Sequence, residues 1–125
     1  MILDTNALSA LADGEPGAVG KFACALQVAI PAIVLGQYRS GIAQSRHRRE
    51  YERWLEEMVS LVRVLEVNEE TAVWYARIRT QLKAAGIPIP SNDAWFAALC
   101  RQYALPLMSR GQHFDLIKGL QRVDW

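Results

Sequence analysis

The first six residues, Met1-Ile2-Leu3-Asp4-Thr5-Asn6, constrain the fold more than any other stretch of the chain. The three apolar residues predict a short buried strand. Asp4 follows at the end of this strand, before residues that favour turns and helix caps. Because ligands of open α/β sheets bind beyond the carboxyl ends of the strands, Asp4 is a candidate functional carboxylate. The alternative is that Asp4 only caps a helix starting near Ala7.

The rest of the chain alternates short apolar segments with longer amphipathic ones. Strands are predicted at 28–30, 62–67, 105–109 and 120–125, and helices at 7–12, 18–26, 31–43, 47–61, 69–85 and 94–103. Asn68 is expected to cap one helix, and Ser91 or Asn92 to cap another. Strands that alternate with helices predict an α/β fold, with a mainly parallel sheet covered on both faces.

Composition limits the class of protein. With 125 residues, of which 51% are hydrophobic, the chain is expected to form a single domain over residues 1–125. A net charge of +1 indicates neither a nucleic-acid nor a membrane partner by itself. The sequence lacks an apolar run of membrane-spanning length and shows no signal-peptide pattern, so we expect a soluble, cytoplasmic protein.

A second acid, Asp93, falls in the first turn of the late helix at 94–103. Carboxylates that gather from distant segments repel each other unless a cation holds them together. Mg²⁺ is a hard cation that binds one or two carboxylates together with water and phosphate oxygens. Such a site can activate water and stabilise the charge of phosphodiester cleavage. Spacing alone does not bring Asp4 and Asp93 together; their meeting depends on the fold.

Four stretches occur in the order and at the intervals typical of one family. They are Leu3-Asp4-Thr5-Asn6; Ile30-Pro31-Ala32-Ile33-Val34-Leu35-Gly36 with Arg39-Ser40-Gly41; Ile89-Pro90-Ser91-Asn92-Asp93-Ala94-Trp95-Phe96-Ala97-Ala98; and Leu105-Pro106-Leu107-Met108-Ser109-Arg110 with His113-Phe114. On these motifs the chain resembles PIN-domain proteins, and specifically the VapC-type toxins of bacterial and archaeal toxin–antitoxin pairs.

The resemblance implies a PIN-like three-layer fold with a five-stranded, mainly parallel sheet. It implies a Mg²⁺- or Mn²⁺-dependent endoribonuclease that acts on RNA, forms a homodimer and has an antitoxin protein as its partner. It places Asp4, Gln37 and Asp93 at catalytic positions, with Asp4 and Asp93 as metal ligands. Asn6, Ser109 and Arg110 stand at the positions expected to bind substrate.

Two positions depart from the family pattern. Gln37 stands where the second motif normally has glutamate, and Gly111 where the fourth normally has aspartate. A glutamine has no negative charge and a glycine no side chain, so we expect weak binding of one Mg²⁺ or Mn²⁺ and weakened activity. An aspartate at position 111 would add backbone strain if Gly111 has a positive φ. His113, beside Phe114, is expected to be structural or solvent-facing.

Whether the chain is an active enzyme is therefore left open at this point. The alternative function is a catalytically silent PIN fold that binds a protein or RNA without cutting it. A third possibility is that Gln37 or Gly111 was introduced to allow expression of a toxic protein.

Overall fold

The sheet is built from five short strands, all parallel, in a computed structural model that describes residues 1–125. The strands are β1 (Ile2–Leu3), β2 (Ala29–Pro31), β3 (Arg63–Leu65), β4 (Leu107–Met108) and β5 (Arg122–Val123). Their order across the sheet is β3-β2-β1-β4-β5. The expectation of a five-stranded, mainly parallel sheet is confirmed, and the observed sheet is wholly parallel.

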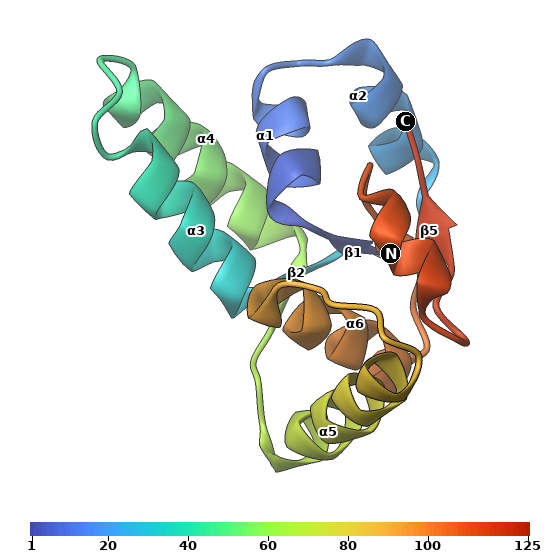
Figure 1. Cartoon of the computed structure of the whole chain (residues 1–125). Coiled ribbons are helices and arrows are strands. Elements are labelled where there is room, and N and C mark those ends of the chain that lie inside the picture. Colours follow the sequence, from blue (N-terminus) through green and yellow to red (C-terminus); the bar gives the residue numbers. More distant parts are fainter.

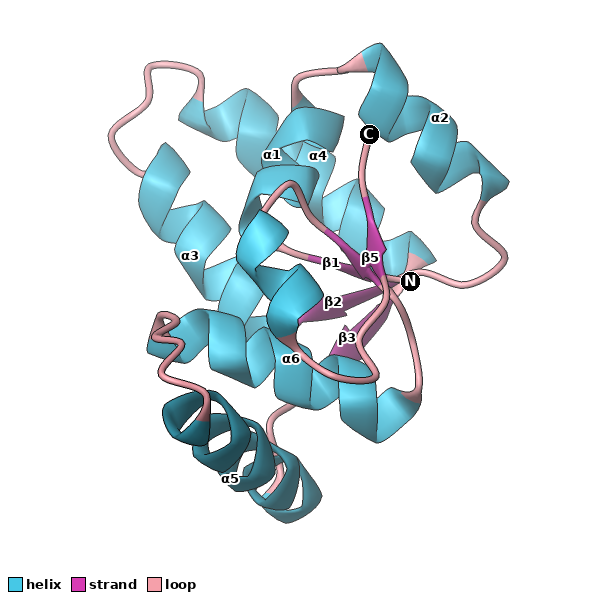
Figure 2. Cartoon of the chain, turned by 45° about the vertical axis from the view of Figure 1, so that its right-hand side comes forward, coloured by secondary structure: helices cyan, strands magenta, loops and turns pink.

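The helices form two groups around this sheet. They are α1 (Thr5–Ala12), α2 (Pro16–Cys24), α3 (Ala32–Ile42), α4 (Arg48–Leu61), α5 (Glu69–Ala84) and α6 (Ser91–Tyr103), with a short 3-10 helix η1 (Gln112–Leu116). Helix α1 contacts α2, α3 and α4, whereas α5 packs mainly on α6. Figure 1 shows the strands running between these two groups, and Figure 2 shows the same layers from a second direction. The predicted PIN-like three-layer fold is therefore observed.

Strand β1 is the centre of the molecule. Ile2 and Leu3 are completely buried, and β1 pairs with β2 on one side and β4 on the other. Two residues with no polar side-chain atoms suit a strand covered on both faces, because nothing on them needs solvent. Since the chain turns aside directly after Leu3, the sheet ends there and leaves a crevice beside Asp4.

Of the two predicted helix caps, one is confirmed and one is wrong. Asn68 caps α5 as predicted, because its side chain accepts a hydrogen bond from Thr71 N at 3.1 Å. The prediction that Ser91 or Asn92 caps α6 is wrong. Helix α6 begins at Ser91 and its cap is Pro90, whose restricted φ suits the residue before a helix. Asp93 consequently lies in the first turn. None of the helices is long and apolar enough to cross a membrane.

Candidate functional site

Asp4 caps α1 and is also the buried acid at the end of the central strand. Its Oδ1 accepts a hydrogen bond from Ala7 N at 2.8 Å, which satisfies a backbone donor at the start of the helix. Its own N–H donates to Met108 O at 3.3 Å, which ties it to the end of β4. The side chain is only 6% exposed. Asp4 therefore caps α1, as the alternative proposed, and the Ser109 hydroxyl also bonds its carboxylate.

Burial raises the pKa of Asp4 above its ordinary value, and the negative charge of Asp93 raises it further. The Ser109 hydroxyl and the backbone N–H of Ala7 act in the opposite direction, because they donate hydrogen bonds to the carboxylate. The charge of Asp93 contributes to this shift, so the two acids lie within electrostatic range of each other, although 89 positions separate Asp4 from Asp93 in the sequence.

His113 contacts one of the two candidate acids. Its Nε2 lies 2.7 Å from Asp93 Oδ2, in hydrogen-bonding contact. The side chain is also 38% exposed, as expected for a solvent-facing residue, but the sequence did not indicate the contact with Asp93. Its ring also packs on Phe114, with 4.4 Å between ring centroids. Phe114 is buried, so it anchors η1 and fixes where His113 points.

Gly111 makes room for that histidine. A Cβ at position 111 would lie 2.8 Å from His113 Cε1 and 3.1 Å from two Phe114 ring atoms. The φ of Gly111 is −71°, which any residue can adopt, so the expected backbone strain is absent. Crowding by the two rings, rather than the backbone, opposes an aspartate here. The Gly111 N–H donates to Ser109 Oγ at 3.0 Å, so this turn also positions the hydroxyl beside Asp4.

Gln37 is held at the edge of the same site. It lies in α3, and its Oε1 accepts a hydrogen bond from the Thr5 hydroxyl, in the residue that follows Asp4. The amide therefore has a fixed position. The carbonyl oxygen has a second lone pair, so the hydrogen bond from Thr5 leaves Gln37 one neutral position that could face a metal ion.

The predicted substrate-binding residues lie in different surroundings. Ser109 is fully buried beside Asp4. Asn6 and Arg110 line a separate cavity of about 500 Å³. Arg110 is engaged there, since its guanidinium stacks over the Trp125 ring at 4.4 Å and pairs with Glu15 at 3.4 Å. A substrate phosphate would have to compete with Glu15 for this arginine.

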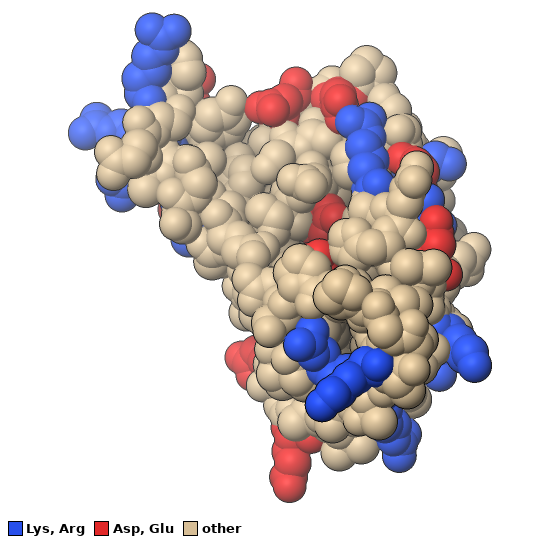
Figure 3. All heavy atoms as spheres, viewed as in Figure 1, with Lys and Arg blue, Asp and Glu red and all other residues tan.

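The donors present fit a divalent cation held by few protein ligands. Asp4 and Asp93 supply hard carboxylate oxygens, which Mg²⁺ and Mn²⁺ prefer. The pKa of Asp4 is raised mainly by burial and to a smaller extent by the charge of Asp93, and a bound cation would offset both effects. No group of three or more His, Cys, Asp and Glu side chains is arranged to hold a metal ion. In Figure 3 acidic atoms occupy a recess at the centre of the visible face, and the Lys and Arg side chains lie mainly around it.

Comparison with known proteins defines the class. The family model described as the PIN domain matches residues 1–120. The chain therefore belongs to the PIN domain family, in agreement with the fold and with the position of Asp4 and Asp93.

Individual relatives within this family extend over the whole chain. Ribonuclease VapC1 of Haemophilus influenzae is 27% identical, with 99% of this chain and 96% of the relative covered. The structure of VapBC2 from Rickettsia felis bound to a DNA fragment from its promoter superposes with a TM-score of 0.89 at 21% identity, over 99% and 97% of the two chains. VapBC-5 of Mycobacterium tuberculosis, a member of the VapBC family of toxin–antitoxin systems, gives 0.74 at 21% identity, over 99% and 97%. At this identity the two structures support the fold alone.

Proposed function

We propose that this chain is a VapC-like toxin, an endoribonuclease that cuts RNA phosphodiester bonds with a divalent cation. The observation that carries the proposal is a buried carboxylate, Asp4, directly after the central strand β1 and within electrostatic range of a second acid, Asp93. The similarity to a ribonuclease over nearly the full length of both chains supports it.

Asp4 and Asp93 would hold the cation, which supplies an activated water and charge stabilisation when bound. Ser109 donates to Asp4 and keeps its carboxylate oriented, and the turn at Gly111 positions Ser109 in turn. His113 contacts Asp93 through Nε2. Its imidazole can therefore exchange a proton with a substrate group bound beside Asp93. Gln37 keeps the glutamate shape without its charge, so the cation is Mg²⁺ or Mn²⁺, weakly bound, and cleavage is slow.

The biological setting follows from the same relatives. We propose an antitoxin protein as the partner and a homodimer as the assembly. VapBC-5 of Mycobacterium tuberculosis belongs to a family of toxin–antitoxin systems, and VapBC2 of Rickettsia felis is bound to promoter DNA.

The test is cleavage of a mixed pool of single-stranded RNA by the purified chain in Mn²⁺ and in EDTA. We expect slow cleavage in Mn²⁺, none in EDTA, and none with Asp4→Asn or Asp93→Asn. Gln37→Glu should cut faster than the original chain, because it restores a charge that Thr5 already holds in position. Cleavage by Asp4→Asn at the original rate would contradict the assignment and indicate a contaminating nuclease.

The second candidate is a silent PIN fold that binds protein or RNA without cutting. No third acidic or histidine side chain is arranged with Asp4 and Asp93 to hold a metal ion, which favours this candidate. If the chain is such a silent binder, neither the original chain nor Gln37→Glu should cleave RNA at high Mn²⁺ in the same assay.

A further inference from the structure

A polar cavity lies beside the carboxylates, between α1, α3 and α4. Its volume is about 310 Å³. The residues that line it are Thr5, Ser9, Asp13, Gln37, Tyr38, Gly41, Ile42, Ser45 and Tyr51. Thr5 follows Asp4 directly and bonds Gln37, so these two side chains form the wall between the cavity and the carboxylate site. A group bound in the cavity would therefore be adjacent to the scissile bond of a bound RNA.

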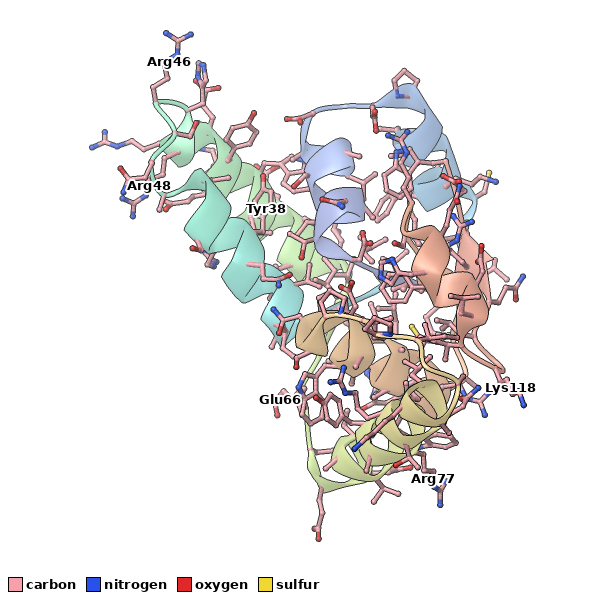
Figure 4. All side chains as sticks on the ribbon, viewed as in Figure 1. Tyr38, Arg46, Arg48, Glu66, Arg77 and Lys118 are labelled. Carbon is pink, nitrogen blue, oxygen red and sulfur yellow. The ribbon has the colours of Figure 1, made fainter.

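Tyr38 is the unusual member of this lining. The residue is only 4% exposed, and its hydroxyl is buried without any hydrogen-bond partner. It is the only buried side-chain nitrogen or oxygen in the chain that is left unpaired. An unpaired buried hydroxyl is costly, so it marks a position where a partner is missing. Figure 4 shows Tyr38 between α1 and the α3–α4 pair.

Tyr38 is packed against other residues of the cavity lining. The ring of Tyr51 lies edge-on to that of Tyr38, with centroids 6.5 Å apart. The Tyr51 hydroxyl donates to Asp13 Oδ1 at 3.0 Å, so Asp13 is not available to Tyr38 through that oxygen. Burial raises the pKa of Tyr38 to about 12, with smaller effects from Tyr51 and Asp13. The Tyr38 hydroxyl is thus neutral and able to donate at neutral pH.

We infer that this cavity binds a nucleobase of the RNA strand next to the cleaved phosphate, and that the Tyr38 hydroxyl is a specificity-determining contact. The inference rests on the proposed ribonuclease function. Bases of single-stranded RNA are read by hydrogen bonds to their edges and by contact with aromatic rings. The cavity offers both, through hydroxyl and amide groups and through the rings of Tyr38 and Tyr51.

The composition of the lining argues for a base rather than another ligand. No Lys or Arg lines the cavity and Asp13 is acidic, so a phosphate is disfavoured. Most lining residues are polar, so an aliphatic side chain of a protein partner would leave buried hydroxyls unpaired. Beyond Ser45, at the outer end, Arg46 extends into solvent, where the RNA backbone can reach it.

The test measures RNA binding without cleavage. Four fluorescein-labelled hexaribonucleotides, of A, C, G or U only, are titrated in EDTA and followed by fluorescence anisotropy. We expect the original chain to prefer one base, and Tyr38→Phe to lose about tenfold in affinity for that base alone. Tyr38→Phe should melt at the same temperature as the original chain or higher, because the hydroxyl it removes is unpaired. Tyr103→Phe, the same change outside the cavity, should bind as the original chain does.

A second pair of variants fills the cavity instead of removing the hydroxyl. Gly41 lines the cavity, lies within α3, and has open space where a Cβ would be, so Gly41→Leu should fold and obstruct entry. We expect it to abolish the base preference. Gly20→Leu, at an equally open glycine of α2, should keep it.

Equal affinity of the original chain for all four oligonucleotides would overturn the inference. So would an unchanged base preference in both Tyr38→Phe and Gly41→Leu. These results are independent of the nuclease proposal, because binding in EDTA requires neither metal nor cleavage. If the nuclease proposal is wrong, the chain will instead fail to cleave RNA in Mn²⁺.

Discussion

At the scale of single residues, Asp4 both caps a helix and is a candidate metal ligand. As a cap it satisfies Ala7 N, and as a carboxylate it is buried beside Asp93. The same hydrogen bond that starts α1 therefore fixes one oxygen of the candidate metal ligand. Burial opposes its ionisation, so the ionised form of Asp4 destabilises the folded chain until a cation binds.

This cost should be visible as a pH dependence of stability. Because the pKa of Asp4 is raised in the folded state, its favourable contribution is complete below the ordinary value of 3.8 and is lost as pH rises through the folded pKa. Asp4→Asn keeps a capping oxygen and removes the charge. In metal-free buffer we expect Asp4→Asn to unfold at higher urea than the original chain at pH 7, with the difference shrinking toward pH 3.

Asp4→Ala is the control, because it removes the charge and the cap together. It should be about 1 kcal/mol less stable than Asp4→Asn at every pH. An Asp4→Asn variant that is less stable than the original chain at pH 7 would show that the buried charge is not destabilising.

At the scale of elements, the segment after β4 organises one half of the site. Within a few residues it supplies the Ser109 hydroxyl to Asp4 and the His113 ring to Asp93. Sequence reasoning found the segment but not the contact between Asp93 and the His113 ring, which occupies the space that a side chain at residue 111 would need. The available space depends on how large the side chains on the two sides of this turn are, and sequence spacing does not predict it.

Gly111→Asp is therefore not a simple repair of the missing acid. Its Cβ collides with the His113 and Phe114 rings, and such overpacking costs about 1–3 kcal/mol. We expect the single change to lower stability measured by urea unfolding. His113→Ala removes one of the two crowding rings, so Gly111→Asp should cost clearly less when made in a His113→Ala background. Equal costs in the two backgrounds would mean that His113 does not limit position 111.

At the scale of the whole molecule, strand–helix alternation predicted the layers and the parallel sheet. It placed Asp4 at the end of a strand, but Asp93 lies in the first turn of α6, so only the family resemblance assigned both acids to one site. Contacts such as Arg110 with Trp125 and Glu15 could not be predicted, because they join three segments whose positions only the finished fold determines. The unpaired Tyr38 hydroxyl was equally invisible, since burial without a partner leaves no pattern in the sequence.

The proposed homodimer is the prediction at this scale. Met58 is buried in the chain's own core, with Tyr51 and Trp54 packed against it, so these residues do not leave an apolar face on α4. Large apolar side chains are exposed elsewhere, including Leu61 at 78% and Leu116 at 52%. We expect light scattering to give twice the chain mass of 14.0 kDa over a dilution series. A chain that stays monomeric at high concentration would contradict the dimer.

The measurement that tests the account most directly is Mn²⁺ affinity by titration calorimetry. The account attributes metal binding to Asp4 and Asp93 and its weakness to the neutral Gln37. We expect Gln37→Glu to bind Mn²⁺ roughly tenfold more tightly than the original chain, and Asp93→Asn to show no measurable binding. Asp115→Asn, which removes an acid paired with Arg122, should bind as the original chain does. Equal Mn²⁺ affinity for the original chain and Asp93→Asn would contradict the account.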